Sequence, residues 1–266
     1  KKDQYQNLKG KIRVVHSTDT GRVRDHNEDA ASADMDVGMI ALADGMGGYS
    51  GGEVASRMTV DTVLREMLHE SPCENLEQCL DRMEHAVERA NVAVWRAGEH
   101  SPELKGMGTT IVLGRFLGGD LAFSWVGDSR IYLLRNGRLV QLTDDHTLVR
   151  ELVSKGLFDS KEEAIEAGVG ENLLTHAVGT EGPVPVSTGS METALDDFYL
   201  FCSDGLTHMV GDRAIEQVLA DREMSLGAKA DRMVQLALEG GGMDNITVVL
   251  VGVTAAETSA PEVQGA

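Results

Sequence analysis

The fold is decided by residues 109–142, which read TTIVLGRFL GGD LAFSWV GDS RIYLLR NG RLVQL. The first two apolar runs flank Gly118-Gly119-Asp120, and two later runs, 131–135 and 138–142, flank Asn136-Gly137. An Asn-Gly dipeptide between two such runs is the strongest short-range indication of a β-hairpin. This stretch therefore predicts antiparallel strands joined by tight turns.

Further strands and helices are predicted on both sides of this stretch. Apolar runs predict strands at 37–43, 198–202 and 246–253. Apolar residues recurring every three or four positions predict helices around 54–68, 76–94 and 226–237. Hairpins separated by helices favour an α+β layered sandwich over a doubly wound parallel sheet.

The domain boundaries follow from the polar segments. We expect one domain over residues 12–254, preceded by a polar segment at 1–11 and followed by a disordered tail at 255–266. Residues 144–176 are charged, weakly patterned and placed between strands, so we expect a partly helical surface excursion there.

The charge balance excludes several classes of function. Twenty-four Lys and Arg against 43 Asp and Glu give a net charge of −19, which repels nucleic acids and anionic membrane surfaces. The longest strongly apolar run, 246–253, is too short to span a bilayer. We expect no nucleic-acid or membrane partner, a cytoplasmic setting and a monomer.

The three cysteines, Cys73, Cys79 and Cys202, form no CxxC pair. Six positions separate Cys73 from Cys79, so we expect the two to face different sides of one helix. All three are interpreted as free thiols in a reducing compartment, with Cys202 buried in a strand.

Acidic residues stand at the ends of the predicted strands. Each occurs in a pattern that an ordinary turn also produces. Several strand ends at one edge of a sheet stack can nevertheless bring the side chains together. The positions are Asp44, Asp128, Asp204 and Asp244, with the pair Glu28-Asp29 after a short β-like segment.

Such a cluster of acids needs a positive partner, because two like charges about 4 Å apart repel by about 4 kcal/mol at an effective dielectric of 20. Only His26 and His208 lie within a few residues of these acids. A ligand set of carboxylates with no His or Cys nearby favours Mg²⁺ or Mn²⁺ over zinc. Two such ions can lower the pKa of a bridging water and orient a phosphate, so the expected substrate is a phosphoester.

Two further features bear on the phosphate. Arg24, five residues before Asp29, could bind phosphate oxygens through its planar fork, and Arg22 is the competing candidate. The glycines of residues 44–52 allow close backbone approach. Because the chain has no GKS, GKT or GxGxxG motif, a glycine-lined metal loop fits better than a nucleotide cradle.

With these motifs in order, the chain resembles the metal-dependent Ser/Thr protein phosphatases of the 2C (PPM) type, particularly their compact bacterial members. The resemblance covers about residues 12–253. The matching segments are 24–29 (RDHNED), 43–48 (ADGMGG), 108–110 (GTT), 126–130 (VGDSR), 142–146 (LTDDH), 202–207 (CSDGLT) and 244–248 (DNITV).

The resemblance implies a four-layer sandwich with two central antiparallel β-sheets flanked by helices, and a binuclear Mn²⁺ or Mg²⁺ centre. A metal-bridging water or hydroxide would attack phosphoserine or phosphothreonine in line, opposing a cognate Ser/Thr kinase and acting on its phosphorylated protein targets. The implied metal residues are Asp44 for both ions, Asp204 and Asp244 for one, Gly45 (carbonyl) and Glu28 for the other, and Asp128 for a weaker third ion.

The resemblance also assigns the remaining roles. Arg24 would bind phosphate and Asp29 would orient metal-bound water, while residues 145–175 fall where relatives carry a mobile flap. Met46 stands where many eukaryotic relatives have a histidine general acid. The proton donor would then be metal-bound water or one of three histidines, His26, His176 and His208.

Two alternatives stay open at this point. One is a catalytically inactive regulatory or scaffold module of the same fold, although loss of the metal carboxylates would be its expected mark. The other is a phosphatase acting on phosphorylated anti-sigma antagonists. The residues select no pathway, and type VI secretion control is one example of many. His176, in THAVG, replaces an arginine found in relatives, which could alter substrate choice.

Overall fold

The computed structural model describes residues 12–34, 36–48, 50–69 and 72–254. The segments predicted at 1–11 and 255–266 lie outside these residues. Among the described helices, none combines the length and the apolar character needed to cross a membrane.

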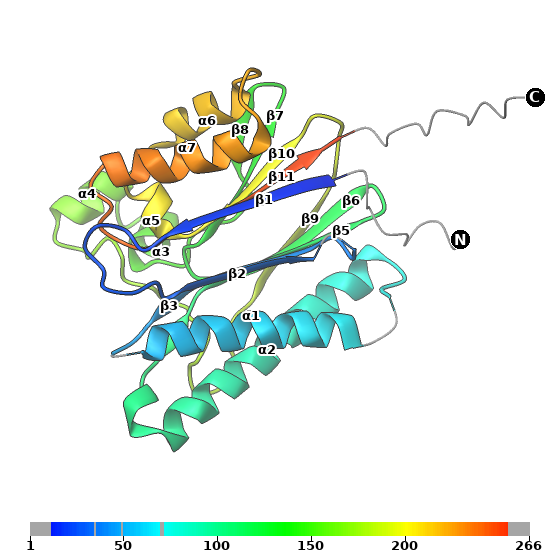
Figure 1. Ribbon diagram of the computed structural model, residues 1–266. Coiled ribbons are helices and arrows are strands. Elements are labelled where there is room, and N and C mark those ends of the chain that lie inside the picture. The colour runs from blue at the N-terminus through cyan, green and yellow to red at the C-terminus, as the bar shows by residue number, and fades with distance from the viewer. Residues whose placement is uncertain (1–11, 35, 49, 70–71, 255–266) are drawn as a thin grey trace, which may run out of the picture.

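Two antiparallel sheets form the centre of the molecule (Figure 1). In the described chain, the first sheet has the strand order β1-β11-β10-β7-β8. Its strands are β1 (Ile12–Asp19), β7 (Arg130–Arg135), β8 (Arg138–Gln141), β10 (Phe198–Cys202) and β11 (Ile246–Val253). The second has the order β2-β3-β5-β6-β9, with β4 paired to β3. Its strands are β2 (Asp29–Asp34), β3 (Met39–Met46), β4 (Gly108–Thr109), β5 (Ile111–Leu117), β6 (Asp120–Val126) and β9 (Ser187–Glu192).

Helices cover the outer face of each sheet (Figure 1). The second sheet is covered by α1 (Gly51–His69) and α2 (Leu76–His100), and the first by α6 (Asp212–Ala220) and α7 (Leu226–Glu239). The shorter helices are η2 (Pro102–Leu104), α3 (Leu148–Ser154), α4 (Lys161–Glu166) and α5 (Asp204–Thr207). The prediction of an α+β sandwich of four layers is therefore confirmed.

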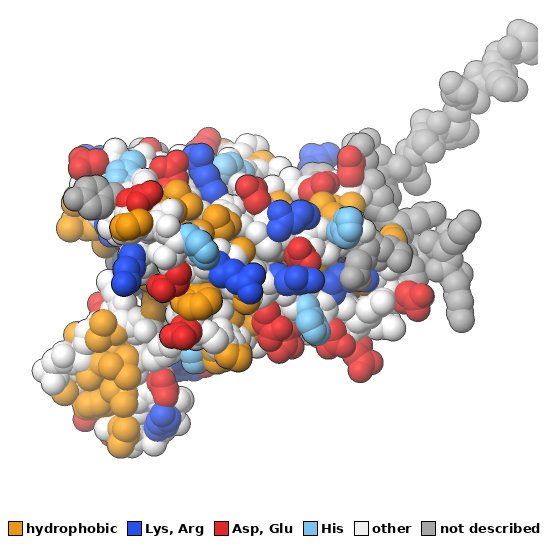
Figure 2. Space-filling view, turned by 90° about the horizontal axis from the view of Figure 1, so that it is seen from below, with side chains coloured by type: hydrophobic (Ala, Val, Ile, Leu, Met, Phe, Trp, Pro, Cys, Tyr) orange, Lys and Arg blue, Asp and Glu red, His pale blue; other side chains and the backbone are white. Residues whose placement is uncertain are grey.

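Three apolar clusters hold the layers together. The central one lies between the sheets, where the rings of Phe116 and Tyr199 meet edge to face with their centroids 5.4 Å apart. The outer two lie between each sheet and its helices. Seen from the α1–α2 side, the surface carries basic and acidic side chains interspersed with one another (Figure 2).

The hairpin predicted at Asn136-Gly137 joins β7 to β8. Both turn residues have positive φ, 53° and 76°, as a type I′ turn requires. Residues 144–176 contain α3 and α4 between strands, as expected. The strand predicted at 37–43 corresponds to β3, but β3 begins at Met39 and runs to Met46, because its last residues pair with β2 and β4.

Candidate active site

The predicted acids come from both sheets and lie at one end of them, on the left in Figure 1. Asp29 begins β2 and faces Asp44 of β3 as its cross-strand partner. Asp128 follows the end of β6, Asp204 follows β10 as the first residue of α5, and Asp244 precedes β11. Asp44 therefore lies within a strand instead of just after one.

Asp44 is the acid most strongly affected by its surroundings. Burial raises its pKa well above the ordinary value, and the negative charges of Asp29 and Asp204 raise it further. Its backbone is held on both sides: its N–H donates to Thr110 Oγ1 (3.0 Å), and its carbonyl accepts from Thr109 Oγ1 (2.8 Å). A carboxylate in this position needs either a proton or a cation.

Asp29 is held by a serine from the opposite sheet. Ser203 Oγ donates to Asp29 Oδ2 at 2.7 Å, and the backbone N–H of Thr247 donates to the same hydroxyl. Burial raises the pKa of Asp29 to about 7, although the hydrogen bonds from Thr247 and Ser203 act in the opposite direction. Its second oxygen, Oδ1, finds no hydrogen-bond partner among the residues that the structure describes.

Asp128 and Asp204 are the two acids that follow β6 and β10. Burial raises the pKa of Asp128 to about 7, and the charges of Asp204 and Asp145 add to the effect. Burial also raises the pKa of Asp204, while His208, with Nδ1 3.3 Å from Asp204 Oδ2, counteracts the rise. Within the described chain, Asp204 Oδ1 has no hydrogen-bond partner.

Asp244 already has a positive partner. Arg24 Nη2 donates to Asp244 Oδ2 at 2.7 Å. The neighbouring Asn245 accepts from the backbone N–H of Glu28 (2.8 Å) and donates to the carbonyls of Thr20 (2.8 Å) and His26 (3.0 Å). Asn245 therefore fixes the loop that carries Arg24 and Glu28. Sequence reasoning included Asn245 in a motif but gave it no role.

The glycine loop allows the close approach that the sequence predicted. A Cβ on Gly45 would lie 2.0 Å from the Gly52 carbonyl oxygen, and a Cβ on Gly52 would lie 2.7 Å from Glu28 Oε1. Gly52 thus leaves room for the Glu28 carboxylate at the positive N-terminus of α1. Tyr49 of this loop lies outside the described residues.

These residues fit a hard divalent cation chemically. In the described ranges, three buried carboxylate oxygens find no hydrogen-bond partner, namely Glu28 Oε1, which has only His26 Nε2 at 3.4 Å, Asp29 Oδ1 and Asp204 Oδ1. Carboxylate oxygens are the ligands that Mg²⁺ and Mn²⁺ prefer. Among the residues that the structure describes, however, no three acids or histidines are close enough together to form a ready-made metal site. Asp244 is paired with Arg24, and Asp204 with His208.

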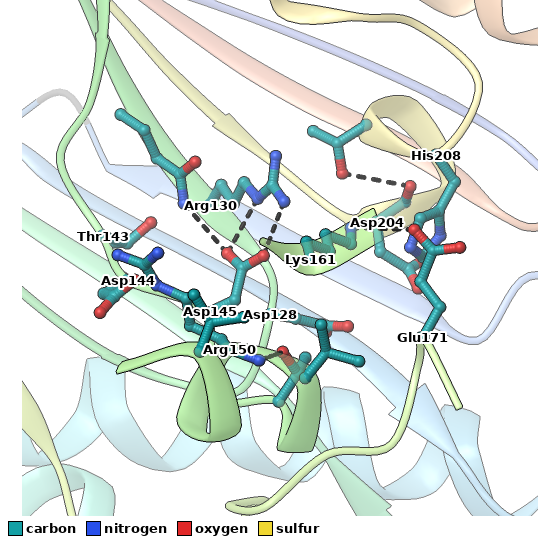
Figure 3. Close-up of a pocket in the computed structure, with 15 residues that line it drawn as sticks. Asp128, Arg130, Thr143, Asp144, Asp145, Arg150, Lys161, Glu171, Asp204 and His208 are labelled. Carbon is teal, nitrogen blue, oxygen red and sulfur yellow. Dashed lines mark hydrogen bonds and ion pairs between the residues drawn. The ribbon is translucent and has the colours of Figure 1, made fainter. Parts of the chain in front are cut away.

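A cavity of about 330 Å³ connects this end of the molecule to the segment at 144–176 (Figure 3). Of the predicted site residues, Asp128 and Asp204 line it, whereas Arg24, Glu28, Asp29, Asp44, Gly45 and Asp244 do not. The guanidinium of Arg130 donates two hydrogen bonds, of 2.8 and 2.6 Å, to the carboxylate of Asp145. Lys161 at the start of α4 pairs with Glu171 at 2.8 Å, which joins α4 to the stretch that follows it within this segment.

His146 holds the base of this excursion. Its Nδ1 accepts from the N–H of Gly127 (3.1 Å), beside Asp128, and its carbonyl accepts from the N–H of Thr175 (2.9 Å). Nε2 lies 3.0 Å from Ser187 Oγ and, since Nδ1 accepts, Nε2 carries the proton. Burial lowers the pKa of His146 to about 4, and His176 adds to this effect. The sequence analysis quoted His146 in a motif without assigning this role.

The candidates for the proton donor lie in different places. Met46 is the last residue of β3 and pairs with Gly108. A Cβ added to Gly108 would lie 3.7 Å from Met46 Cγ. His26 Nε2 lies 3.4 Å from Glu28 Oε1, and His208 contacts Asp204. His176 instead packs against His146, with ring centroids 4.9 Å apart.

Comparisons with known proteins point to a single family. A family model described as protein phosphatase 2C matches residues 20–239. The serine/threonine phosphatase stp of Listeria welshimeri is 38% identical over 237 residues, which cover 88% of this chain and 93% of the relative.

Solved structures agree with this. A serine/threonine phosphatase from S. agalactiae is 36% identical, with a TM-score of 0.84 over 91% of this chain and 99% of that chain. The catalytic domain of the serine/threonine protein phosphatase PstP, solved in complex with two manganese ions, is 38% identical. Its TM-score is 0.78 over 92% of this chain and 99% of that chain. A close structural relative therefore holds two manganese ions.

Proposed function

Because this chain belongs to the protein phosphatase 2C family, we propose that it removes phosphate from phosphoserine and phosphothreonine of proteins in a reaction that depends on divalent metal ions. Family membership confirms the resemblance inferred from the motifs and makes the chain a protein-serine/threonine phosphatase. Its substrates are phosphorylated proteins, and it opposes a serine/threonine kinase in bacterial signalling.

The observation that carries this proposal is the set of buried acids contributed by both sheets. Three of their oxygens are buried without a hydrogen-bond partner in the described part of the chain, and burial raises the pKa of four of the carboxyls. Keeping such groups ionised at neutral pH is costly unless cations share the site. An inactive scaffold of the same fold would be expected to lack these acids, so their presence disfavours that alternative.

Two ions, Mn²⁺ or Mg²⁺, would be held by Asp44 together with Asp204 and Asp244 on one side and Glu28 and the Gly45 carbonyl on the other. Asp128 is proposed for a weaker third ion. When bound, such ions supply a water of lowered pKa and neutralise phosphate charge. The chain itself orients the acids: Ser203 fixes Asp29, and Asn245 fixes the backbone of Glu28.

Arg24 is the proposed phosphate-binding residue. Its guanidinium is half exposed and reaches the acids through Asp244, so a phosphate entering the site would meet it beside them. A planar guanidinium can bind two phosphate oxygens at once. The cavity beside Asp128 and Asp204 would receive the polypeptide that carries the phosphate, with residues 145–175 as its mobile wall.

A comparison of phosphopeptides tests this function. The same peptide is prepared with phosphothreonine, phosphoserine or phosphotyrosine, and phosphate release is measured with Mn²⁺ present. We expect turnover of the first two and at least tenfold less of the third. Asp44→Asn, which keeps the size of the side chain, should abolish turnover and is the matched control. Equal turnover of all three, or an active Asp44→Asn enzyme, would contradict the proposal.

A further inference from the structure

Asn91, in the second half of α2, is a buried residue whose side chain uses its full hydrogen-bonding capacity. Its Oδ1 accepts from the backbone N–H groups of Gly179 (2.7 Å) and Thr180 (3.0 Å). Its Nδ2 donates to the backbone carbonyls of Thr180 (3.1 Å) and Gly182 (2.9 Å). An amide side chain has two donor hydrogens and an oxygen with two lone pairs, so all four are occupied. Asn91 thus joins α2 to a turn 88 to 91 positions later in the chain.

The turn at 179–182 lies in the irregular segment between α4 and β9, so side chains must hold it in place. Gly179 has a φ of 104°, a conformation that favours glycine. A Cβ there would lie 2.8 Å from the carbonyl oxygen of Met107 and 2.8 Å from Val94 Cγ1. The turn therefore packs directly against α2 and against the residue that precedes β4.

The residue before this turn supports β4, a strand of two residues beside the candidate metal site. The N–H of Val178 donates to the carbonyl of Thr109 (2.8 Å), and the N–H of Thr109 donates to the carbonyl of Val178 (3.0 Å). On its other edge, β4 pairs with Gly45 and Met46 at the end of β3. Because an isolated pair of short strands is only marginally stable, the Val178 contact helps to place β4.

β4 in turn holds the backbone of Asp44, the residue proposed to contact both ions. Thr109 Oγ1 and the N–H of Thr110 both donate to the carbonyl of Asp44, at 2.8 and 2.9 Å. The Asp44 carboxylate projects from this backbone. A displacement of β4 would therefore displace the carboxylate as well.

We propose that Asn91 is a positioning residue of the metal site: it fixes the 179–182 turn, the turn places β4, and β4 places Asp44. This inference rests on the metal role proposed for Asp44. Metal sites depend on the hydrogen-bonded groups behind the ligands as well as on the ligands themselves. If Asn91 only stabilised the fold, its loss would leave the metal affinity of the folded protein unchanged.

Mn²⁺ binding to the folded protein, measured by isothermal titration calorimetry, tests this role without relying on turnover. Asn91→Leu keeps a similar side-chain volume and removes all four hydrogen bonds. We expect it to bind Mn²⁺ about tenfold more weakly, at the lower end of the loss typical when a group that orients a metal ligand is removed.

Met83→Ala is the matched control. Met83 is buried in the same helix, and truncating it leaves a cavity that destabilises the fold. Urea unfolding of the metal-free proteins shows how much free energy of unfolding each variant loses. Met83→Ala should bind Mn²⁺ as tightly as the wild type despite its loss of stability.

A second variant tests the route through β4. Thr109→Val keeps the shape of the side chain and the backbone contact with Val178, but it removes the hydroxyl that donates to Asp44. Residues that act along one route are coupled, so the double variant with Asn91→Leu should lose less Mn²⁺ affinity than the product of the two single losses. Single losses that simply multiply would show that Asn91 does not act through Thr109.

The proposal is overturned if folded Asn91→Leu binds Mn²⁺ as tightly as Met83→Ala, even where its ranking of phosphopeptides changes. If Asn91→Leu does not fold, Asn91→Asp takes its place, because it keeps the oxygen that accepts from Gly179 and Thr180 and loses the two donors. Its loss of Mn²⁺ affinity should be smaller but still exceed that of Met83→Ala, and an equal affinity would overturn the proposal. A wild-type protein that binds Mn²⁺ but releases no phosphate from peptides would contradict the proposed function alone.

Discussion

Arg24 Nη2 donates a 2.7 Å hydrogen bond to Asp244 Oδ2, so the proposed phosphate-binding residue is joined to a proposed metal ligand. Arg24→Ala should lower kcat/KM on a phosphothreonine peptide by about 10- to 100-fold, because a hydrogen bond to a charged group contributes about 1.5–3 kcal/mol. Arg22→Ala is the matched control, since Arg22 contacts Gly242 through its backbone N–H. Equal losses in steady-state kinetics of the two variants would refute the assignment.

Met46 bears on the proton that the leaving serine or threonine oxygen needs. A thioether has no proton to give, so Met46→Ala should leave turnover of an aryl phosphate nearly unchanged. Met46→His should raise phosphoserine turnover relative to aryl phosphate below about pH 7, where His is partly protonated. The check is the ratio of the two rates across pH. If His slows both substrates alike, Met46 only packs against the Gly108 segment.

His146 should make stability depend on pH. Its pKa is about 4 in the folded protein and about 6.5 when unfolded, so the unfolded chain binds the extra proton first and stability falls as pH drops from 6.5 to 4. Because His146 is only partly buried, we expect the free energy of unfolding to fall by roughly 1–2 kcal/mol over this pH range. Protonated Nδ1 can no longer accept from Gly127.

His146→Asn isolates this effect, because its amide oxygen can accept the same hydrogen bond without titrating. Urea unfolding of the two metal-free proteins at pH 6.5 and pH 4.5 gives the free energy of unfolding that each loses on acidification. Asp144, Asp145 and the other titrating groups are present in both proteins, so their contributions largely cancel when the two losses are compared. Wild type should lose more stability than the variant. A variant that loses as much as wild type would show that His146 is not the titrating group.

The segment between the His146 and Thr175 anchors should govern peptide choice. Lys161 and Glu171 tie it together, and it carries none of the proposed metal acids. Exchanging residues 148–173 for the equivalent segment of a relative should change the ranking of phosphopeptides while aryl phosphate turnover stays within about threefold. A parallel loss on peptides and aryl phosphate would mean that the segment supports the chemistry itself.

Much of the fold was predictable because the central strands carry long apolar runs. β10 and β11 have the predicted bounds, and β7 and β8 flank the Asn-Gly turn as expected. β9, with the sequence STGSME, has no β-branched apolar residue and is held by pairing with β6. It was not predicted. β1 carries polar residues along much of its length and was indicated only as a short β-like segment before Glu28-Asp29.

That these acids lie at one end of the two sheets was predictable from their positions at strand ends, but the contacts that orient them were not. Ser203 reaches Asp29 across 174 positions, and Asn245 reaches Glu28 across 217. Contacts this distant depend on strand register, which a single sequence does not display. The prediction that Cys73 and Cys79 share one helix was wrong for a local reason: Asn75 is the N-cap of α2, which begins at Leu76, so Cys73 lies before the helix.

The most direct test of the central claim is phosphate release from a phosphothreonine peptide in excess chelator, followed by titration with Mn²⁺. The buried acids and their unpartnered oxygens predict no turnover in chelator and full recovery as Mn²⁺ fills the site. Asp204→Asn and Asp244→Asn should need far more Mn²⁺ or fail to recover. Undiminished turnover in excess chelator would contradict the account.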